Sequence, residues 1–360
     1  MLVTCQNESK KSVFLNNKFI FELKVNTLTR IKDKYIFEYQ FWRLADHFGG
    51  NKTPSNRFEN KRKDISSTLH SEFKNTKAKG SLRKVDRVKN ISDYELKKKY
   101  INKGIPVVLE GKAKDWVCVK KWTMDWLYKN YCDDKVSLFD AVNTEDINFD
   151  VEETTLKSVL DAMKSNDSSK YIRFNRILYE HPELINDFDW KWLYRMRNKI
   201  SSGKTFQVFI GGKGSRTTLH SASEHNLFTQ VYGKKHWYLY PPENDVILNP
   251  PINRSPYFYS KYDPDKPDFD AYPNAKFLQT WECELKAGDV LFNPPSWWHQ
   301  VTNIENSIGV GFRWFSPLDS FKSSFTQTLL TIMSSNPPIW TAAKNRTNFA
   351  QIFKYMKEQK

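Results

Sequence analysis

The sequence predicts a mainly β protein with flanking helices, built around an antiparallel barrel or sandwich. Two observations lead to this prediction. From residue 205 onward, short apolar strands alternate with turns that contain Gly and Pro, as in antiparallel barrels and sandwiches. Before and after that stretch, apolar residues recur at helical spacing in residues 122–131, 155–164 and 320–333.

Composition limits the class of protein. The chain has 360 residues, of which 39% are hydrophobic and 15% aromatic, so it can bury a sizeable core and global disorder is excluded. No run approaches the roughly 18 apolar residues of a membrane span, and polar residues interrupt the one N-terminal apolar stretch, residues 14–25. Four scattered cysteines without CxxC spacing argue against a zinc ribbon. We therefore expect a cytoplasmic protein.

The charge is strongly basic, with a net value of +15. This excess favours an anionic partner, including a nucleic acid, or a solvated basic surface. Residues 1–90 form the first predicted region, and the aromatic-rich residues 34–47 within it should pack on something. Residues 51–90 are rich in Lys, Arg, Ser and Asn. That composition predicts a mobile basic segment or a long surface excursion, sensitive to proteases.

A mixed region of helices and strands is predicted for residues 91–204. Ser92 can cap a helix, with Glu95 completing a capping box, and Gly104 should end it. A buried strand follows at residues 105–109, before the first two helical stretches named above.

The barrel itself is predicted for residues 205–317. Its expected strands read TFQVFIGG, NLFTQVYG, KHWYLYPP, TWECEL, VLFNPP, WWHQVTN and IGVGFRWF. Helical patterns return in residues 318–360, and their amphipathic face could form a homodimer interface.

Two of the seven histidines have distinctive surroundings. His220 follows a Thr-Thr-Leu run and precedes a strand, whereas His299 follows Pro-Pro-Ser-Trp-Trp at the start of another. A double-stranded barrel can bring such residues together in its mouth. Two neutral imidazoles suit iron, copper, nickel or zinc, so the pair is a candidate metal site.

The quoted motifs make the chain similar to a known family. Residues 105–317 resemble the JmjC and cupin-like oxygenases, the class of the asparaginyl hydroxylase that inhibits hypoxia-inducible factor. The matching segments are IPVVLEGKAKDW, YEHPELINDFDW, TTLHSASEHNLFTQVYGKKHWYLYPP and LKAGDVLFNPPSWWHQVTN, in the same order and spacing. The resemblance implies a double-stranded β-helix and chemistry that uses Fe(II), 2-oxoglutarate and O₂.

The resemblance also implies roles for individual residues. His220 and His299 match the iron-binding histidines, and Lys235 matches the lysine that pairs with the distal carboxylate of 2-oxoglutarate. Thr217 matches a residue whose hydroxyl hydrogen-bonds the same carboxylate. Asn226 and Phe228 match residues of the pocket near 2-oxoglutarate. Lys234 should point to the opposite face of the same strand.

The chain departs from the family at two positions. Ala222 stands where the family carries Asp or Glu, two residues after the first iron-binding histidine, and Gly311 stands where some relatives carry Asn. Glu224 is the nearest acid that could replace the missing one. In an extended strand it would lie roughly 13 Å from His220 along the chain, so it could bind the metal only after a sharp turn. His225 is a further candidate, more consistent with a loop histidine.

Without a protein acid, Ala222 would leave an open metal position. A chloride or bromide ion could fill it, as in the 2-oxoglutarate halogenases, whose sites read His-x-Ala or His-x-Gly. We therefore predict a halogenase acting on an unactivated C–H bond of a small molecule or peptide, with an anionic substrate favoured. Two alternatives stay open. One is a hydroxylase that uses Glu224 or water as the third ligand, and the other is an inactive JmjC-like binding module whose basic region binds nucleic acid.

Overall fold

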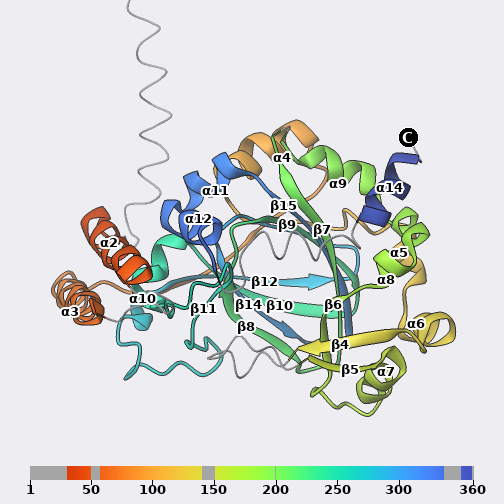
Figure 1. Ribbon diagram of the computed structural model, residues 1–360, viewed down its shortest axis with the longest axis horizontal. Helices are drawn as coiled ribbons and strands as arrows, with labels where there is room; N and C mark the ends of the chain where they lie inside the picture. Colours follow the sequence, from red (N-terminus) through yellow and green to blue (C-terminus); the bar gives the residue numbers. More distant parts are fainter. Residues whose placement is uncertain (1–30, 50–56, 140–150, 199, 336–349, 359–360) are drawn as a thin grey trace, which may run out of the picture.

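Two β-sheets form the body of the protein, and helices surround them (Figure 1). The computed structural model describes residues 31–49, 57–139, 151–198, 200–335 and 350–358. The predicted mainly β fold with flanking helices is confirmed, and the two facing sheets fit the double-stranded β-helix that the family resemblance implied.

The six-stranded sheet carries both histidines. Its order is β1 (Ser81–Lys84), β12 (Gln279–Lys286), β10 (Lys234–Tyr240), β14 (Trp298–Asn303), β8 (Arg216–Ser221) and β11 (Phe258–Tyr259). All its pairings are antiparallel except β1 with β12. In this sheet β14 lies between β10 and β8, so that His299 is directly opposite His220.

The seven-stranded sheet faces it. Its order is β2 (Asp86–Val88), β3 (Val107–Leu109), β13 (Val290–Asn293), β9 (His225–Tyr232), β15 (Ser307–Phe315), β7 (Ser202–Gly211) and β6 (Tyr171–Asn175). A separate hairpin pairs β4 (Lys135–Phe139) with β5 (Val151–Thr155).

Helices cover the outside of the sheets (Figure 1). Those that precede the barrel strands are α2 (Asp33–Gly49), α3 (Glu59–Asn75), α4 (Asp93–Lys99), α5 (Val117–Lys121), α6 (Met124–Tyr131), α7 (Leu156–Lys164), α8 (Ile177–Glu180) and α9 (Trp190–Met196). Within and after the barrel come α10 (Asp245–Leu248), α11 (Pro317–Ser323), α12 (Phe325–Ile332) and α14 (Ala350–Glu358). Short 3-10 turns are η1 (Ile101–Lys103), η2 (Pro182–Asp187), η3 (Pro242–Asn244) and η4 (Ala275–Phe277).

Local sequence signals explain where several helices begin. The Ser92 hydroxyl accepts a hydrogen bond from the Glu95 amide at 3.2 Å, so the predicted cap of α4 is confirmed. Thr155 caps α7 in the same way. Gly104 ends the following 3-10 turn with φ of 64°, a left-handed conformation that glycine adopts without strain.

The expectation of a mobile basic segment at residues 51–90 is wrong for the part that the structure describes. Helix α3 buries an apolar stripe, and β1 and β2 extend the two barrel sheets by parallel pairing. The stripe consists of Ile65, Leu69 and Phe73, spaced four residues apart among Lys, Ser and Asn. Such a narrow stripe is enough to dock a helix although the average composition is polar. Residues 51–56 lie outside the described part, and the predicted regions 1–90, 91–204, 205–317 and 318–360 stay a prediction.

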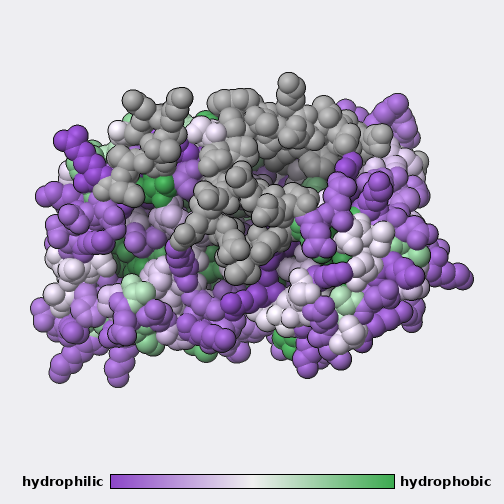
Figure 2. Space-filling model, turned by 60° about the horizontal axis from the view of Figure 1, so that its bottom comes forward, coloured by the Kyte–Doolittle hydropathy of each residue, from purple (hydrophilic) through white to green (hydrophobic). Residues whose placement is uncertain are grey.

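Apolar side chains form packed clusters inside the barrel and on its outside. A cluster between the sheets includes Phe228, Trp237, Leu291 and Val301. A larger cluster packs the seven-stranded sheet against the helices around Trp122. Among the described helices, none is long and apolar enough to cross a membrane. Figure 2 shows one face as mostly hydrophilic, with hydrophobic residues only in small scattered areas.

Candidate functional site

The six side chains that the family resemblance singled out line one cavity between the two sheets. They are Thr217, His220, Asn226, Phe228, Lys235 and His299. The remaining lining residues are Tyr171, Phe209, Trp237, Val301 and Arg313. The cavity is narrow, with a volume of about 20 Å³, which holds about one water molecule. A larger ligand therefore enters only when lining side chains move.

His220 and His299 form a close pair. Their ring centroids are 4.1 Å apart, because β8 and β14 place the two residues opposite each other. The His220 Nδ1–H donates to the Thr218 carbonyl at 2.8 Å, and the His299 Nδ1–H donates to the Trp297 carbonyl at 3.0 Å. In this tautomer each Nε2 carries a lone pair. Metal-binding histidines are commonly oriented through their other nitrogen in this manner.

Both imidazoles are held in the neutral form that metal binding requires. Burial lowers the pKa of His220 to about 4. Burial, and then the neighbouring His220, hold the pKa of His299 well below its ordinary value. The pair therefore fits a divalent metal such as Fe(II), to which it would contribute two ligands.

Lys235 is a buried cation whose partners in the described part of the chain are neutral. Its ammonium donates to the Asn303 side-chain carbonyl and lies 3.4 Å from the Tyr171 hydroxyl. The side chain is 0% exposed, and burial lowers its pKa. A buried ammonium is costly without a counter-charge, so this position fits a ligand carboxylate. Lys234 points the other way, as predicted, and pairs with Glu305 at 2.8 Å.

The Asn226 side chain can also bind a ligand by hydrogen bonds. Both its side-chain oxygen and its nitrogen are buried with no hydrogen-bond partner among the described residues. Its amide packs against Gly311, where a Cβ would lie 2.8 Å from Oδ1. A Cβ at Gly309 would lie 2.3 Å from the Phe228 ring. The glycines of β15 therefore make room for the side chains that line the cavity.

Ala222 and Glu224 lie beside the cavity rather than among the residues that line it. Strand β8 ends at Ser221, and the chain then bends at residues 223–224. The Glu224 carboxylate lies 3.7 Å from the Arg313 guanidinium. In the described residues, no group of three His, Cys, Asp or Glu side chains is arranged to hold a metal. The acid replaced by Ala222 thus has no substitute in this arrangement.

Arg313 is the site residue that sequence reasoning missed. It lies on β15, lines the cavity and is 7% exposed. Its charge acts on both histidines, since it contributes to the lowered pKa of each. The signal was present in IGVGFRWF, where alternation places Gly309, Gly311 and Arg313 on one face of the strand.

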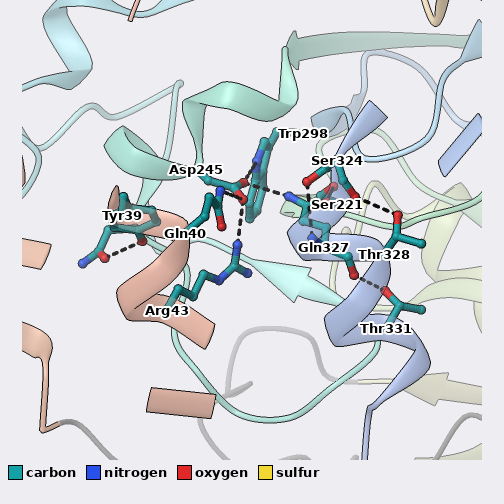
Figure 3. A network of polar contacts seen from close by, with 11 residues as sticks. Tyr39, Gln40, Arg43, Ser221, Asp245, Trp298, Ser324, Gln327, Thr328 and Thr331 are labelled. Atoms are coloured by element: carbon teal, nitrogen blue, oxygen red, sulfur yellow. Dashed lines mark hydrogen bonds and ion pairs between the residues drawn. The ribbon is translucent and has the colours of Figure 1, made fainter. Parts of the chain in front are cut away.

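A buried polar network supports the strands next to the histidines (Figure 3). Asp245 is at its centre and forms an ion pair with Arg43 of α2, 2.6 Å long. Its other oxygen accepts from the Trp298 indole at 2.7 Å and from the Gln327 amide at 2.7 Å. The Ser221 hydroxyl donates to Gln327 at 2.9 Å. Trp298 precedes one histidine and Ser221 follows the other, so the network holds the backbone on both sides of the pair.

A groove of about 1150 Å³ lies near the histidine pair. Pro295 and Trp297 form part of its wall, and the Trp297 carbonyl anchors His299. His225 also lines it, buried in β9, stacked 4.7 Å from Trp314 and 3.3 Å from the Asp319 carboxylate. It is therefore not the loop histidine that we expected.

Comparison with known proteins agrees with this geometry. The model of the family described as "Cupin-like domain" matches residues 93–321. JmjC domain-containing protein D of Dictyostelium discoideum is 26% identical over 238 residues, 60% of this chain and 53% of the relative. Lysine-specific demethylase JMJ30 of Arabidopsis thaliana is 28% identical over 234 residues, 62% of this chain and 53% of the relative.

A shorter relative is covered more fully. The tRNA wybutosine-synthesizing protein 5 of Mus musculus is 27% identical over 253 residues, which are 64% of this chain and 77% of the relative. The chain otherwise spans about half the length of the curated relatives first matched. The matched region contains both sheets except β1 and β2 and every candidate site residue. The chain therefore belongs to the cupin-like family that includes the JmjC-domain proteins.

Proposed function

We propose that the protein is an Fe(II)- and 2-oxoglutarate-dependent enzyme that acts on an unactivated C–H bond. The observation that carries this proposal is the cavity that joins two neutral, oriented histidines to a buried lysine without an acidic partner among the described residues. Membership of the family supports the same cofactors. Because the chain spans about half the length of the relatives first matched, the specific reaction is a proposal that experiment must test.

Each side chain of the cavity has a distinct task in this proposal. The Nε2 atoms of His220 and His299 would hold the iron. The Lys235 ammonium and the Thr217 hydroxyl would bind the distal carboxylate of 2-oxoglutarate, while Asn226 would use its two unpaired polar atoms on the bound molecules. Bound iron with 2-oxoglutarate supplies the oxidising power, drawn from O₂. The protein contributes position, charge and a water-poor cavity.

The finer proposal is that the third protein ligand is replaced by an external anion. Ala222 offers a methyl group, which neither binds a metal nor fills the space of a carboxylate. The Arg313 guanidinium favours an anion in this region. Chloride or bromide would satisfy both conditions, and the product would then be a halogenated substrate.

A second candidate reaction is hydroxylation. The chain bends at residues 223–224, so Glu224 does not continue the extended strand that would carry it away from His220. In the described residues, however, Glu224 is not grouped with the two histidines in an arrangement that could hold a metal. The ion pair between Glu224 and Arg313, 3.7 Å long, argues against Glu224 as a metal ligand, because it already engages the carboxylate.

The large groove has room for an extended substrate. The charged residues that line it are mixed: Arg83, Lys99, Lys103 and Lys322 are basic, and Asp86, Glu243 and Asp319 are acidic. Relatives are named for demethylation of lysine and for wybutosine synthesis in tRNA. A protein segment or an RNA would fill a groove of this size better than a small metabolite, and the small excess of basic side chains would accept negative charge on it.

Product analysis by mass tests the proposal. The wild-type protein would be incubated with Fe(II), 2-oxoglutarate and O₂, with and without chloride, over a library of acidic peptides and nucleotides. We expect a substrate mass increase of one chlorine in place of one hydrogen. A hydroxylated product that disappears in Glu224→Ala would instead identify Glu224 as the third ligand. No product with any candidate and no consumption of 2-oxoglutarate would contradict the enzyme assignment.

A further inference from the structure

The cavity carries two cationic side chains and, among the described residues, no acid. Lys235 and Arg313 are both among its lining residues, whereas no Asp or Glu is. The Glu224 carboxylate is 3.7 Å from Arg313, beyond hydrogen-bond distance. Two cations that line one buried space, with a single carboxylate at ion-pair distance from one of them, favour a ligand that brings further negative charge.

The two cations belong to different positions along β15: Lys235 packs beside Gly309, and Arg313 is itself a residue of this strand. Lys235 lies beside Gly309, where a Cβ would be 3.3 Å from the lysine Cε. Arg313 is four residues further along the same strand face, roughly 13 Å by strand rise, and is paired in register with Asn226. Both long side chains line the same cavity. An elongated ligand with one charge at each end matches this arrangement.

Arg313 has unused capacity for hydrogen bonds. Its Nε is buried without a partner among the described residues, and its contact with Glu224 is long. A guanidinium presents several donors in a planar fork that suits a carboxylate. Asn226, between the two cations, is 2% exposed and has both side-chain polar atoms unpaired within the described residues. It can bind the middle of the same ligand.

We propose that this cavity binds a dicarboxylate of the 2-oxoglutarate class without any metal ion, with Lys235 holding one carboxylate and Arg313 the other. The inference shares the role of Lys235 with the proposed function but does not depend on iron. In a site with two histidines and an acid, the metal supplies the charge that holds the near end of the ligand. Here the acid is replaced by Ala222 and a permanent cation lies close by. The guanidinium takes over that task.

Binding requires the Arg313 side chain to shift, because the present cavity holds about one water molecule. The carboxylate would draw the guanidinium from Glu224, so the two acids compete for it. Removing the charge at Glu224 should therefore strengthen binding rather than weaken it. If Glu224 acted only as a metal ligand, removing its charge would not strengthen ligand binding to the metal-free protein.

Isothermal titration of the full chain in excess EDTA tests the inference. The probes would be 2-oxoglutarate, succinate and acetate. We expect 2-oxoglutarate to bind without metal and acetate to bind at least tenfold more weakly, because it has only one carboxylate. Arg313→Gln and Lys235→Gln should each weaken 2-oxoglutarate at least tenfold, and Glu224→Gln should tighten it severalfold. Lys234→Gln and Arg195→Gln are matched controls, since both residues are outside the cavity, and should change affinity less than twofold.

A second arm separates this inference from the proposed function. The titration would be repeated with Mn²⁺ in place of EDTA. Binding with Mn²⁺ but not in EDTA would overturn the inference and leave the proposed function standing. Absence of binding in both would contradict both. Wild-type affinity of a folded Arg313→Gln variant in EDTA would also overturn the inference. If Arg313→Gln unfolds, Arg313→Lys is the substitute, because it keeps the positive charge but not the planar guanidinium. Its 2-oxoglutarate affinity in EDTA should lie between those of wild type and Lys235→Gln. An affinity equal to that of wild type would contradict the role of the guanidinium.

Discussion

Ala222 is the residue whose chemistry separates this chain from enzymes with a complete set of iron ligands. Ala222→Asp should raise affinity for Mn²⁺, used as a stand-in for Fe(II), at least tenfold, because a tethered carboxylate adds both a ligand and a negative charge. Titration calorimetry of the two proteins measures this. Ala222→Ser is the control for added volume without charge. Equal Mn²⁺ affinity of Ala222→Asp and wild type would show that this position does not face the metal.

Gly309 has no side chain, and this leaves the space that the Phe228 ring and the Lys235 side chain occupy. In Gly309→Ala the new Cβ would lie 2.3 Å from the Phe228 ring and 3.3 Å from the Lys235 side chain. We expect the free energy of unfolding to fall by about 1–3 kcal/mol and 2-oxoglutarate affinity to fall with it. Gly311→Ala is the matched comparison and should cost less, since its contact is the end of a side-chain amide. Urea denaturation and calorimetry together check this, and an unchanged Gly309→Ala variant would contradict the close approach of Phe228 to this glycine.

Residues with a motif around them could be predicted, and residues without one could not. His220, His299 and Lys235 were found because the segments that surround them are similar to a family. Arg313 was missed because a single charged residue in a strand indicates a cavity only when the face it occupies is known. Tyr171, which also contacts Lys235, is 64 residues away in the sequence and lies on β6 of the other sheet, so no local pattern indicates this contact.

At the scale of elements, helices outside the matched family region support the site. Helix α2 and helix α12 both reach Asp245, from 202 and 82 residues away in the chain. Contacts of such separation leave no trace in local periodicity. Strands and capped helices were predictable, since they depend on neighbouring residues, whereas the docking of α2 and α3 on the barrel depends on the completed fold.

The Arg43–Asp245 ion pair should matter greatly for stability. Both side chains are buried, at 1% and 0% exposure. Arg43→Met leaves a buried carboxylate without its cation, which typically costs about 3–5 kcal/mol. The control is Lys84→Met, which breaks an ion pair whose lysine is 80% exposed and should cost less than about 1 kcal/mol. Gln40 also donates to the Asp245 carboxylate, at 2.9 Å. Equal losses in urea denaturation would show that Asp245 is sufficiently held by Trp298, Gln327 and Gln40 alone.

At the scale of the whole molecule, the predicted homodimer has a candidate surface. The C-terminal helices expose Leu318, Phe325 and Ile332, at 62%, 62% and 40%. If these helices form the interface, Phe325→Asp should convert a dimer into a monomer in sedimentation velocity, because it places a charge in an apolar contact. Phe37→Asp on α2, where the side chain is 75% exposed, is the control and should remain dimeric. A wild-type protein that sediments as a monomer at every concentration would refute the prediction.

The stability of the whole chain should fall in mild acid, and His47 gives that effect a testable source. It is 4% exposed, and burial, assisted by Arg254 and Arg43, lowers its pKa from 6.5 to about 4. Between these values the unfolded chain binds a proton that the folded chain does not, so the free energy of unfolding decreases as the pH falls from 6.5 toward 4. His47→Gln removes this titration and should therefore show a shallower decrease in urea denaturation between about pH 7 and about pH 4.5. A difference between wild type and His47→Gln that stays constant over that range would mean that His47 is already protonated, or equally free to titrate, in the folded protein.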